Sequence, residues 1–139
     1  MTELMVVTDL DGSLLDHYTY SFAAAVPQVR ALQESDIPLV LCSSKTRSEM
    51  QILREQLSLS SPYIVENGAA VYFPKAQYPH LQDGCDSHVC AVDGGEMRQV
   101  FGNGRVHWQT LLDDLPEVFC GQFKRLSNMS IGQLSDLTG

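Results

Sequence analysis

Residues 6–13 read VVTDLDGS and are the most informative stretch for the fold. In them a short apolar segment is followed directly by two carboxylates and a glycine. The apolar run begins at Leu4 and has the length and composition of a buried parallel strand. In open α/β sheets, ligands bind in the crevice outside the carboxyl ends of such strands. The sequence therefore predicts a ligand site directly after the first strand.

Asp9 and Asp11 are separated by one residue on the loop that follows this strand. Two carboxylates on such a loop can converge on one cation, and hard oxygen donors suit Mg²⁺. One aspartate could attack a phosphorus atom while the other handles the proton on the leaving oxygen. The alternative interpretation is a surface turn of the Asp-Gly kind, in which both acids are solvated.

A second apolar run, residues 39–42, opens onto a loop of hydroxyls and one cation, Ser43-Ser44-Lys45-Thr46. Ser43 is a candidate phosphate ligand, because its hydroxyl can donate to a phosphoryl oxygen beside a helix amino terminus. The alternative is that Ser43, Ser44 and Thr46 are ordinary helix caps. Lys45 is either a substrate clamp or a solvated loop lysine.

Helices and strands alternate around these two loops. A helix is predicted over residues 23–34 with Pro27 in its first turn, and a second helix begins at Thr46, which has capping-box spacing to Glu49. Residues 63–65 form a third short strand, and the Asn67-Gly68 pair predicts a tight hairpin turn after it. This alternation predicts right-handed crossovers and a parallel sheet, with both loops at one edge.

The pattern weakens after Pro74. Residues 89–92 and 99–101 are candidate strands, and a helix is predicted over residues 108–115. Ser130 and Gln133 have the spacing of another capping box, which predicts a last helix.

Length and charge limit the function. A chain of 139 residues with 44% hydrophobic content can bury one core, and a net charge of -8 disfavours nucleic acids and anionic membrane surfaces as partners. No signal peptide or transmembrane span is evident, so we expect a cytoplasmic protein. The cysteines do not form a disulfide framework, and a zinc site at Cys85, His88 and Cys90 lacks the usual ligand spacing.

Three strings resemble one family. TDLDGSLLDH at 8–17, LCSSKT at 41–46 and VENGAA at 65–70 are similar to mannosyl-3-phosphoglycerate phosphatases of the haloacid dehalogenase superfamily, and weaker similarity continues through 129–139. The resemblance implies an α/β fold in which residues 1–80 form part of a parallel-sheet, Rossmann-like core. Residues 81–139 would then begin an α+β cap domain that is apparently truncated.

The resemblance also implies Mg²⁺-dependent hydrolysis of a small phosphorylated sugar acid. Asp9 would attack phosphorus and ligate the metal, and Asp11 would act as acid and base while its carbonyl also binds the metal. The substrate phosphate would lie against Ser43 and the backbone at Leu10, with Ser44 and Lys45 as further substrate-binding residues.

The sequence departs from the family toward its carboxyl end. The superfamily's later lysine and its G-D-x-x-N-D-like string have no counterpart here, because Asp113-Asp114 lies between leucines on a predicted helix. We therefore expect Leu4 to Thr8 to form an exposed apolar edge through which the chain could associate with itself. The alternatives are an inactive remnant or half-domain completed by another chain, another sugar-phosphate phosphatase, and, less favoured, a receiver-type signalling domain.

Overall fold

A computed structural model of the chain describes residues 4–79 and 89–138. The chain forms two compact units, Met1–Gly102 and Asn103–Gly139, and each is described by itself. The disfavoured zinc site would include Cys85 and His88, which lie outside the described residues. No helix of the described part has both the length and the apolar character needed to cross a membrane.

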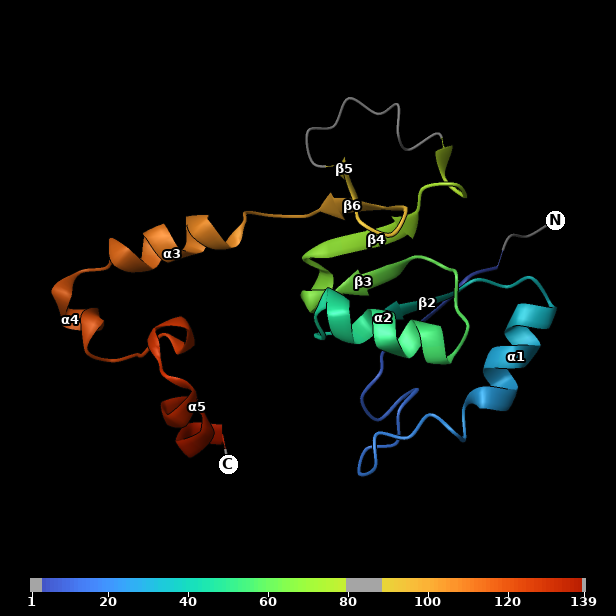
Figure 1. The fold of residues 1–139 in the computed structure, drawn as a ribbon, viewed down its shortest axis with the longest axis horizontal. Helices are drawn as coiled ribbons and strands as arrows, with labels where there is room; N and C mark the ends of the chain where they lie inside the picture. The colour runs from blue at the N-terminus through green and yellow to red at the C-terminus, as the bar shows by residue number, and fades with distance from the viewer. Residues whose placement is uncertain (1–3, 80–88, 139) are drawn as a thin grey trace. The chain divides into compact units, whose positions relative to one another are not determined.

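The first unit is built on a six-stranded mixed sheet with the strand order β1-β2-β3-β4-β6-β5 (Figure 1). The strands are β1 (Val6–Thr8), β2 (Leu39–Cys42), β3 (Tyr63–Val65), β4 (Ala70–Pro74), β5 (Val89–Val92) and β6 (Glu96–Val100). Strands β1, β2 and β3 pair in parallel, whereas the β3–β4, β4–β6 and β5–β6 pairs are antiparallel. The predicted α/β class is confirmed, and parallel pairing is confined to the first three strands.

Two helices, α1 (Val26–Glu34) and α2 (Arg47–Gln56), contribute apolar side chains to one core with the sheet. Val29 of α1 and Met50 of α2 are buried in the same cluster as Leu41 and Tyr63 of the strands. The predicted apolar stripes are therefore the faces that these helices bury. Helix α1 begins three residues later than predicted, because residues 23–25 form a turn and the helix starts beside its proline.

Glu96 of β6 is the centre of a buried polar cluster beneath α2. Its carboxylate accepts hydrogen bonds from Arg47 (2.9 Å), Arg54 (3.2 Å), Gln51 (3.3 Å) and the Tyr63 hydroxyl (3.0 Å). The two arginines and the carboxylate form ion pairs. A buried carboxylate needs such partners, because desolvation would otherwise disfavour its charge.

Two tyrosine rings stack inside this cluster. Tyr63 and Tyr72 lie with ring centroids 5.2 Å apart, the Arg54 guanidinium lies 4.1 Å from the Tyr63 centroid, and Arg47 lies 5.1 Å from the Tyr72 centroid. Burial is the main reason that the pKa of Tyr63 rises to about 12. The hydrogen bond to Glu96 is the largest cause that raises the pKa of Arg47.

Strand β1 lies at the end of the sheet and pairs only with β2 among the described strands. Leu4, Met5 and Val7 are 60%, 58% and 56% exposed. The expected apolar edge is thus present, whereas most natural edge strands carry charges or are covered.

The second unit is helical. It contains α3 (Arg105–Asp113), α4 (Glu117–Cys120), a 3₁₀ turn at Leu126–Asn128 and α5 (Ile131–Thr138). The Ser130 capping box is confirmed, because Ser130 N–H donates to Gln133 Oε1 (2.9 Å) and Gln133 N–H donates to Ser130 Oγ (3.2 Å).

Several predicted boundaries toward the carboxyl end were wrong. Helix α3 overlaps the predicted 108–115 range over residues 108–113 but begins earlier, at Arg105, because Gly104 rather than an apolar residue provides its start. Helix α4 was not predicted. Strand β6 extends from Glu96, so the predicted range 99–101 contains only its end. The assignment of residues 81–139 to a cap domain stays a prediction.

Candidate active site

The first loop folds tightly between two buried leucines. Leu15 N–H donates to Leu10 C=O (2.8 Å), Ser13 N–H donates to the same carbonyl (3.1 Å), and Gly12 N–H donates to Leu15 C=O (3.0 Å). Leu10 and Leu15 are both buried in the core. Gly12 has a φ of 77°, a left-handed conformation that glycine adopts without steric cost.

Burying Leu10 turns its two neighbours outward. Asp9 and Asp11 are both exposed, and the Asp9 carboxylate makes no hydrogen bond or ion pair within the described part of the chain. Thr8 Oγ1 donates to the Asp9 carbonyl (2.8 Å), which fixes the backbone where the strand ends. The Asp9 carboxylate is therefore free to contact a ligand.

Ser43 directly follows β2 and is buried, unlike the exposed Ser44. Its N–H donates to Ile64 C=O (3.1 Å), and its carbonyl accepts from Asn67 N–H (3.0 Å). Its hydroxyl oxygen accepts from Lys45 N–H (3.3 Å). The backbone of Ser43 is thus fixed by β3 and by the turn that follows it.

Thr46, not Ser43, caps α2. Thr46 N–H and its hydroxyl both donate to Glu49 Oε2 (2.8 and 2.6 Å), and the predicted capping box is confirmed. The hydrogen bond from the Thr46 hydroxyl is the main reason that the pKa of Glu49 lies below its ordinary value. Since Thr46 fills the capping role, the hydroxyl of Ser43 can serve a different purpose.

The two loops meet through an ion pair. Lys45 Nζ lies 3.0 Å from Asp11 Oδ1 and 3.2 Å from Oδ2. Neighbouring parallel strands end at the same edge of a sheet, so β1 and β2 bring these residues together from positions far apart in the sequence. The ammonium group also lies 5.7 Å from the centroid of the Tyr20 ring, a contact that no pattern in the sequence predicts.

The third strand supports the second loop. Glu66 N–H donates to Lys45 C=O (3.1 Å), and Glu66 and Asn67 adopt left-handed φ values of 51° and 56°. This turn leads back into the antiparallel strand β4, as the Asn-Gly pair predicted. The contacts of Asn67 with Ser43 are structural, which agrees with the role expected for it.

Hydrogen bonds to Asp16 stabilise the loop after the first motif. Asp16 Oδ1 accepts from Tyr18 N–H (3.1 Å), Thr19 N–H (2.8 Å) and the Thr19 hydroxyl (2.8 Å). The bond from Thr19 N–H is the largest cause that lowers the pKa of Asp16. A hollow of about 270 Å³ lies beside this loop, lined in part by Tyr20, Phe22 and Lys45.

The oxygen donors at the first loop fit a magnesium ion. In the described residues, no group of three or more His, Cys, Asp or Glu side chains converges on one point. Mg²⁺ is commonly held by one or two carboxylates together with waters and substrate phosphate, so Asp9 and Asp11 match that limited demand. The substrate-binding roles expected of Leu10, Ser43, Ser44 and Lys45 stay predictions.

The chain is similar in sequence to two phosphatases of known name. It is 45% identical over 100 residues to a glucosyl-3-phosphoglycerate/mannosyl-3-phosphoglycerate phosphatase from Persephonella marina, over 70% of this chain and 37% of that protein. A phosphatase of the same name from Methanococcoides burtonii is 46% identical over 74 residues, which are 53% of this chain and 27% of the relative. The chain thus spans about a third of the length of these curated relatives.

Solved structures with similarity include a haloacid dehalogenase-like hydrolase from Bacteroides thetaiotaomicron, with a TM-score of 0.46 and 20% identity over 59% of this chain and 36% of that chain. Another is a haloacid dehalogenase-like hydrolase from B. subtilis, with a TM-score of 0.43 and 21% identity over 78% and 43%. The sequence profile of the haloacid dehalogenase-like hydrolases matches residues 6–86, which is more than half of the chain. The chain therefore belongs to the haloacid dehalogenase-like hydrolase family.

Proposed function

We propose that this chain carries the amino-terminal part of a Mg²⁺-dependent phosphatase acting on mannosyl-3-phosphoglycerate through an aspartyl-phosphate. The single observation that supports it best is the meeting of two motif loops at adjacent parallel strand ends, joined by the Asp11–Lys45 ion pair. The names of the curated relatives support the substrate class and extend it to the glucosyl ester. In this proposal residues 1–80 belong to the phosphatase core, and residues 81–139 begin the cap.

Asp9 is the proposed nucleophile because its exposed carboxylate has no competing partner among the described residues. Its oxygen forms a bond to phosphorus while the phosphorus–oxygen bond of the ester breaks, and Asp11 gives a proton to the departing alkoxide. Water then attacks phosphorus, Asp11 takes up the water proton, and inorganic phosphate leaves as the Asp9 carboxylate is restored.

The phosphoryl oxygens need donors and positive charge, because the chain carries a net charge of -8. The Ser43 hydroxyl, the exposed Ser44 and the backbone N–H of Leu10 are the proposed donors. Lys45 brings a cation to the first loop, where its ammonium pairs with Asp11. In this proposal the ammonium moves to the phosphoryl group when substrate binds, and Asp11 then takes up the proton that it gives to the alkoxide.

The Asp9 carboxylate and the Asp11 carbonyl would hold the magnesium ion, with the Asp11 carboxylate close by. When bound, the ion neutralises charge on the transferring phosphoryl group. The side chains of the two loops would orient the substrate and move the proton, which is most of what phosphoryl transfer requires.

A second candidate is a half-domain that becomes active only when another chain covers β1. The exposed Leu4, Met5 and Val7 favour this candidate, because an uncovered apolar edge is a template for strand pairing. Self-association through β1 belongs to this candidate. The receiver-type alternative loses support, because the chain belongs to a hydrolase family.

The deciding experiment measures phosphate release from mannosyl-3-phosphoglycerate by the purified chain with Mg²⁺. Weak turnover that Asp9→Asn abolishes supports the enzyme, and Asp36→Asn is the matched control because Asp36 is an exposed turn residue in the same unit. No turnover in a folded sample would contradict autonomous catalysis. Sedimentation with and without Val7→Lys then tests completion through β1, since the lysine should prevent strand pairing.

A further inference from the structure

Tyr20 lies on the loop between β1 and α1, in a backbone conformation that bulky residues rarely adopt. Its φ is 54°, in the left-handed region. Two backbone hydrogen bonds impose this conformation, because Tyr20 N–H donates to Asp16 C=O (3.0 Å) and Asp16 N–H donates to Ser21 C=O (2.9 Å). Such strained residues persist only where the surrounding structure fixes them, and they cluster at functional sites. The backbone of Tyr20 therefore indicates a role for its side chain.

The Tyr20 ring lies beside the cation of the second loop. The side chain stays 62% exposed, so packing into the core does not account for its position. The Lys45 ammonium lies 5.7 Å from the ring centroid, within the distance at which an aromatic face attracts a cation. Both side chains also line the hollow of about 270 Å³ beside α2. The strained loop thus presents an aromatic ring to a residue of the candidate active site.

The ion pair alone would hold Lys45 weakly. Its partner Asp11 lies 3.0 Å away, but the Asp11 side chain is 42% exposed, and exposed pairs contribute little. A second carboxylate, Glu49, lines the same hollow, although the N–H and hydroxyl of Thr46 occupy its Oε2. A flexible lysine would exchange between these acids and water. The Tyr20 ring adds a contact that restricts the ammonium to the neighbourhood of Asp11.

We propose that Tyr20 is a positioning residue, whose ring holds the Lys45 ammonium at Asp11 until a phosphoryl group binds. The contact between ring and ammonium does not require the proposed phosphatase activity, but its use in binding phosphate rests on that proposed function. An exposed cation–π contact corresponds to a change of about two- to fivefold in an equilibrium constant. Removal of the ring should therefore free the lysine side chain and weaken phosphate binding by about that factor.

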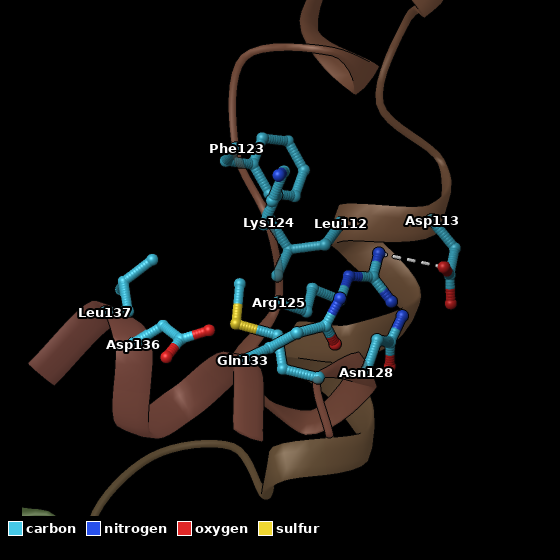
Figure 2. A pocket seen from close by; sticks show the side chains of 10 residues that line it. Leu112, Asp113, Phe123, Lys124, Arg125, Asn128, Gln133, Asp136 and Leu137 are labelled. Carbon is cyan, nitrogen blue, oxygen red and sulfur yellow. Dashed lines mark ion pairs between the residues drawn. The ribbon is translucent and has the colours of Figure 1, made fainter. Parts of the chain in front are cut away.

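The first test measures the motion of the Lys45 side chain by ¹³C relaxation of lysine Cε in the full chain without substrate. The chain has three lysines, Lys45, Lys75 and Lys124, so the spectrum of a ¹³C-lysine sample is simple. Lys124 is the internal reference, because it is exposed, lines a hollow of the second unit (Figure 2) and forms no ion pair within the described residues. We expect a higher order parameter for Lys45 than for Lys124, and a fall toward the Lys124 value in Tyr20→Leu.

Two further variants distinguish the ring from the loop that carries it. Tyr20→Phe keeps the aromatic face and should leave Lys45 as ordered as in the unmodified chain. Tyr18→Leu is the matched control, because Tyr18 is an 88% exposed tyrosine of the same loop whose ring contacts His17. An unchanged order parameter of Lys45 in Tyr20→Leu would overturn the proposal. An equal fall in Tyr18→Leu would overturn it as well, because the loop and not the ring would then hold the lysine.

The second test measures binding of inorganic phosphate to the full chain with Mg²⁺ by calorimetry. Tyr20→Leu should weaken binding about two- to fivefold, but it should have no further effect once Lys45→Met has removed the ammonium. Losses that add in the double variant would overturn the proposal, because Tyr20 would then act independently of Lys45. If the unmodified chain bound no phosphate, the proposed function would be contradicted, whereas the order parameters would still decide the role of Tyr20.

Discussion

Replacing Glu96 with glutamine should destabilise the first unit more than any loss of a surface charge. The side chain keeps its size, but Arg47 and Arg54 lose the carboxylate that both contact at 2.9 and 3.2 Å. The side chains of Arg54 and Glu96 are only 10% and 11% exposed, whereas that of Arg47 is 27% exposed. Most of the lost stability should therefore come from Arg54, because water cannot readily replace its carboxylate partner.

The magnitude follows from these exposures. Removing one member of a fully buried ion pair costs about 3–5 kcal/mol, whereas an exposed pair contributes about 0–1 kcal/mol. The glutamine oxygen still accepts one or two of the four hydrogen bonds. We therefore expect the free energy of unfolding to fall by about 2–3 kcal/mol in Glu96→Gln.

Urea unfolding followed by near-ultraviolet circular dichroism is the assay, because the Tyr63–Tyr72 stack reports on this cluster. Glu55→Gln is the control, since Glu55 is an exposed carboxylate of α2 and its loss should change stability by less than about 0.5 kcal/mol. The double variant Arg54→Met, Glu96→Leu should cost less than the two single changes added together, because it removes the buried guanidinium together with its carboxylate and leaves only the more exposed Arg47 without that partner. If Glu96→Gln proved as stable as the Glu55→Gln control, the ion pairs of Glu96 would not contribute to the stability of the first unit.

Three further predictions concern the same unit. Because folding raises the pKa of Tyr63 from 10.0 to about 12, the neutral phenol contributes stability that is fully present below pH 10 and is lost as the pH rises toward 12. Urea unfolding across that range should show this loss in the unmodified chain and not in Tyr63→Phe. Thr46→Ala should lower the free energy of unfolding by about 1 kcal/mol and move the pKa of Glu49 up toward its ordinary 4.5, as measured by ¹³C NMR, and an unmoved pKa would contradict the capping argument. Lys45→Met should change the free energy of unfolding by less than about 0.5 kcal/mol, because its partner Asp11 is exposed, but it should weaken any turnover of phosphate ester. If turnover fell only as far as the folded fraction of the variant fell, Lys45 would have a structural role alone.

The parts of the fold that the sequence predicted well are those set by local patterns. Strands β2 and β3 have the predicted bounds, and α2 has both its capping box and its buried stripe, because caps and apolar spacing act within four residues. The loop around Asp9 was placed correctly after a strand for the same reason. Its two acids lie outside because Leu10 lies inside.

The parts that the sequence did not predict depend on partners distant in the chain. The Glu96 cluster joins residues 33 to 49 positions apart, and nothing in the local sequence MRQV marks the preceding glutamate as buried. The Lys45–Asp11 pair spans 34 residues and follows from the order of the strands rather than from either motif. Helix α3 was misplaced because its start depends on the backbone of Gly104, which carries no apolar signal.

These distant contacts also stabilise the second loop of the candidate site. Helix α2 begins directly after the Ser43–Thr46 loop, and its first residue, Arg47, bonds both to Glu96 and to Asp93 C=O (2.8 Å). The β5–β6 hairpin therefore fixes the amino terminus of α2, although the hairpin lies beyond the residues that identify the family. A fragment that lacked this hairpin would leave Arg54 with Ser61 C=O (2.7 Å) as its one hydrogen-bond acceptor among the described residues, and would uncover β4. We therefore expect the loop that would hold phosphate to depend on a strand that carries none of its motifs.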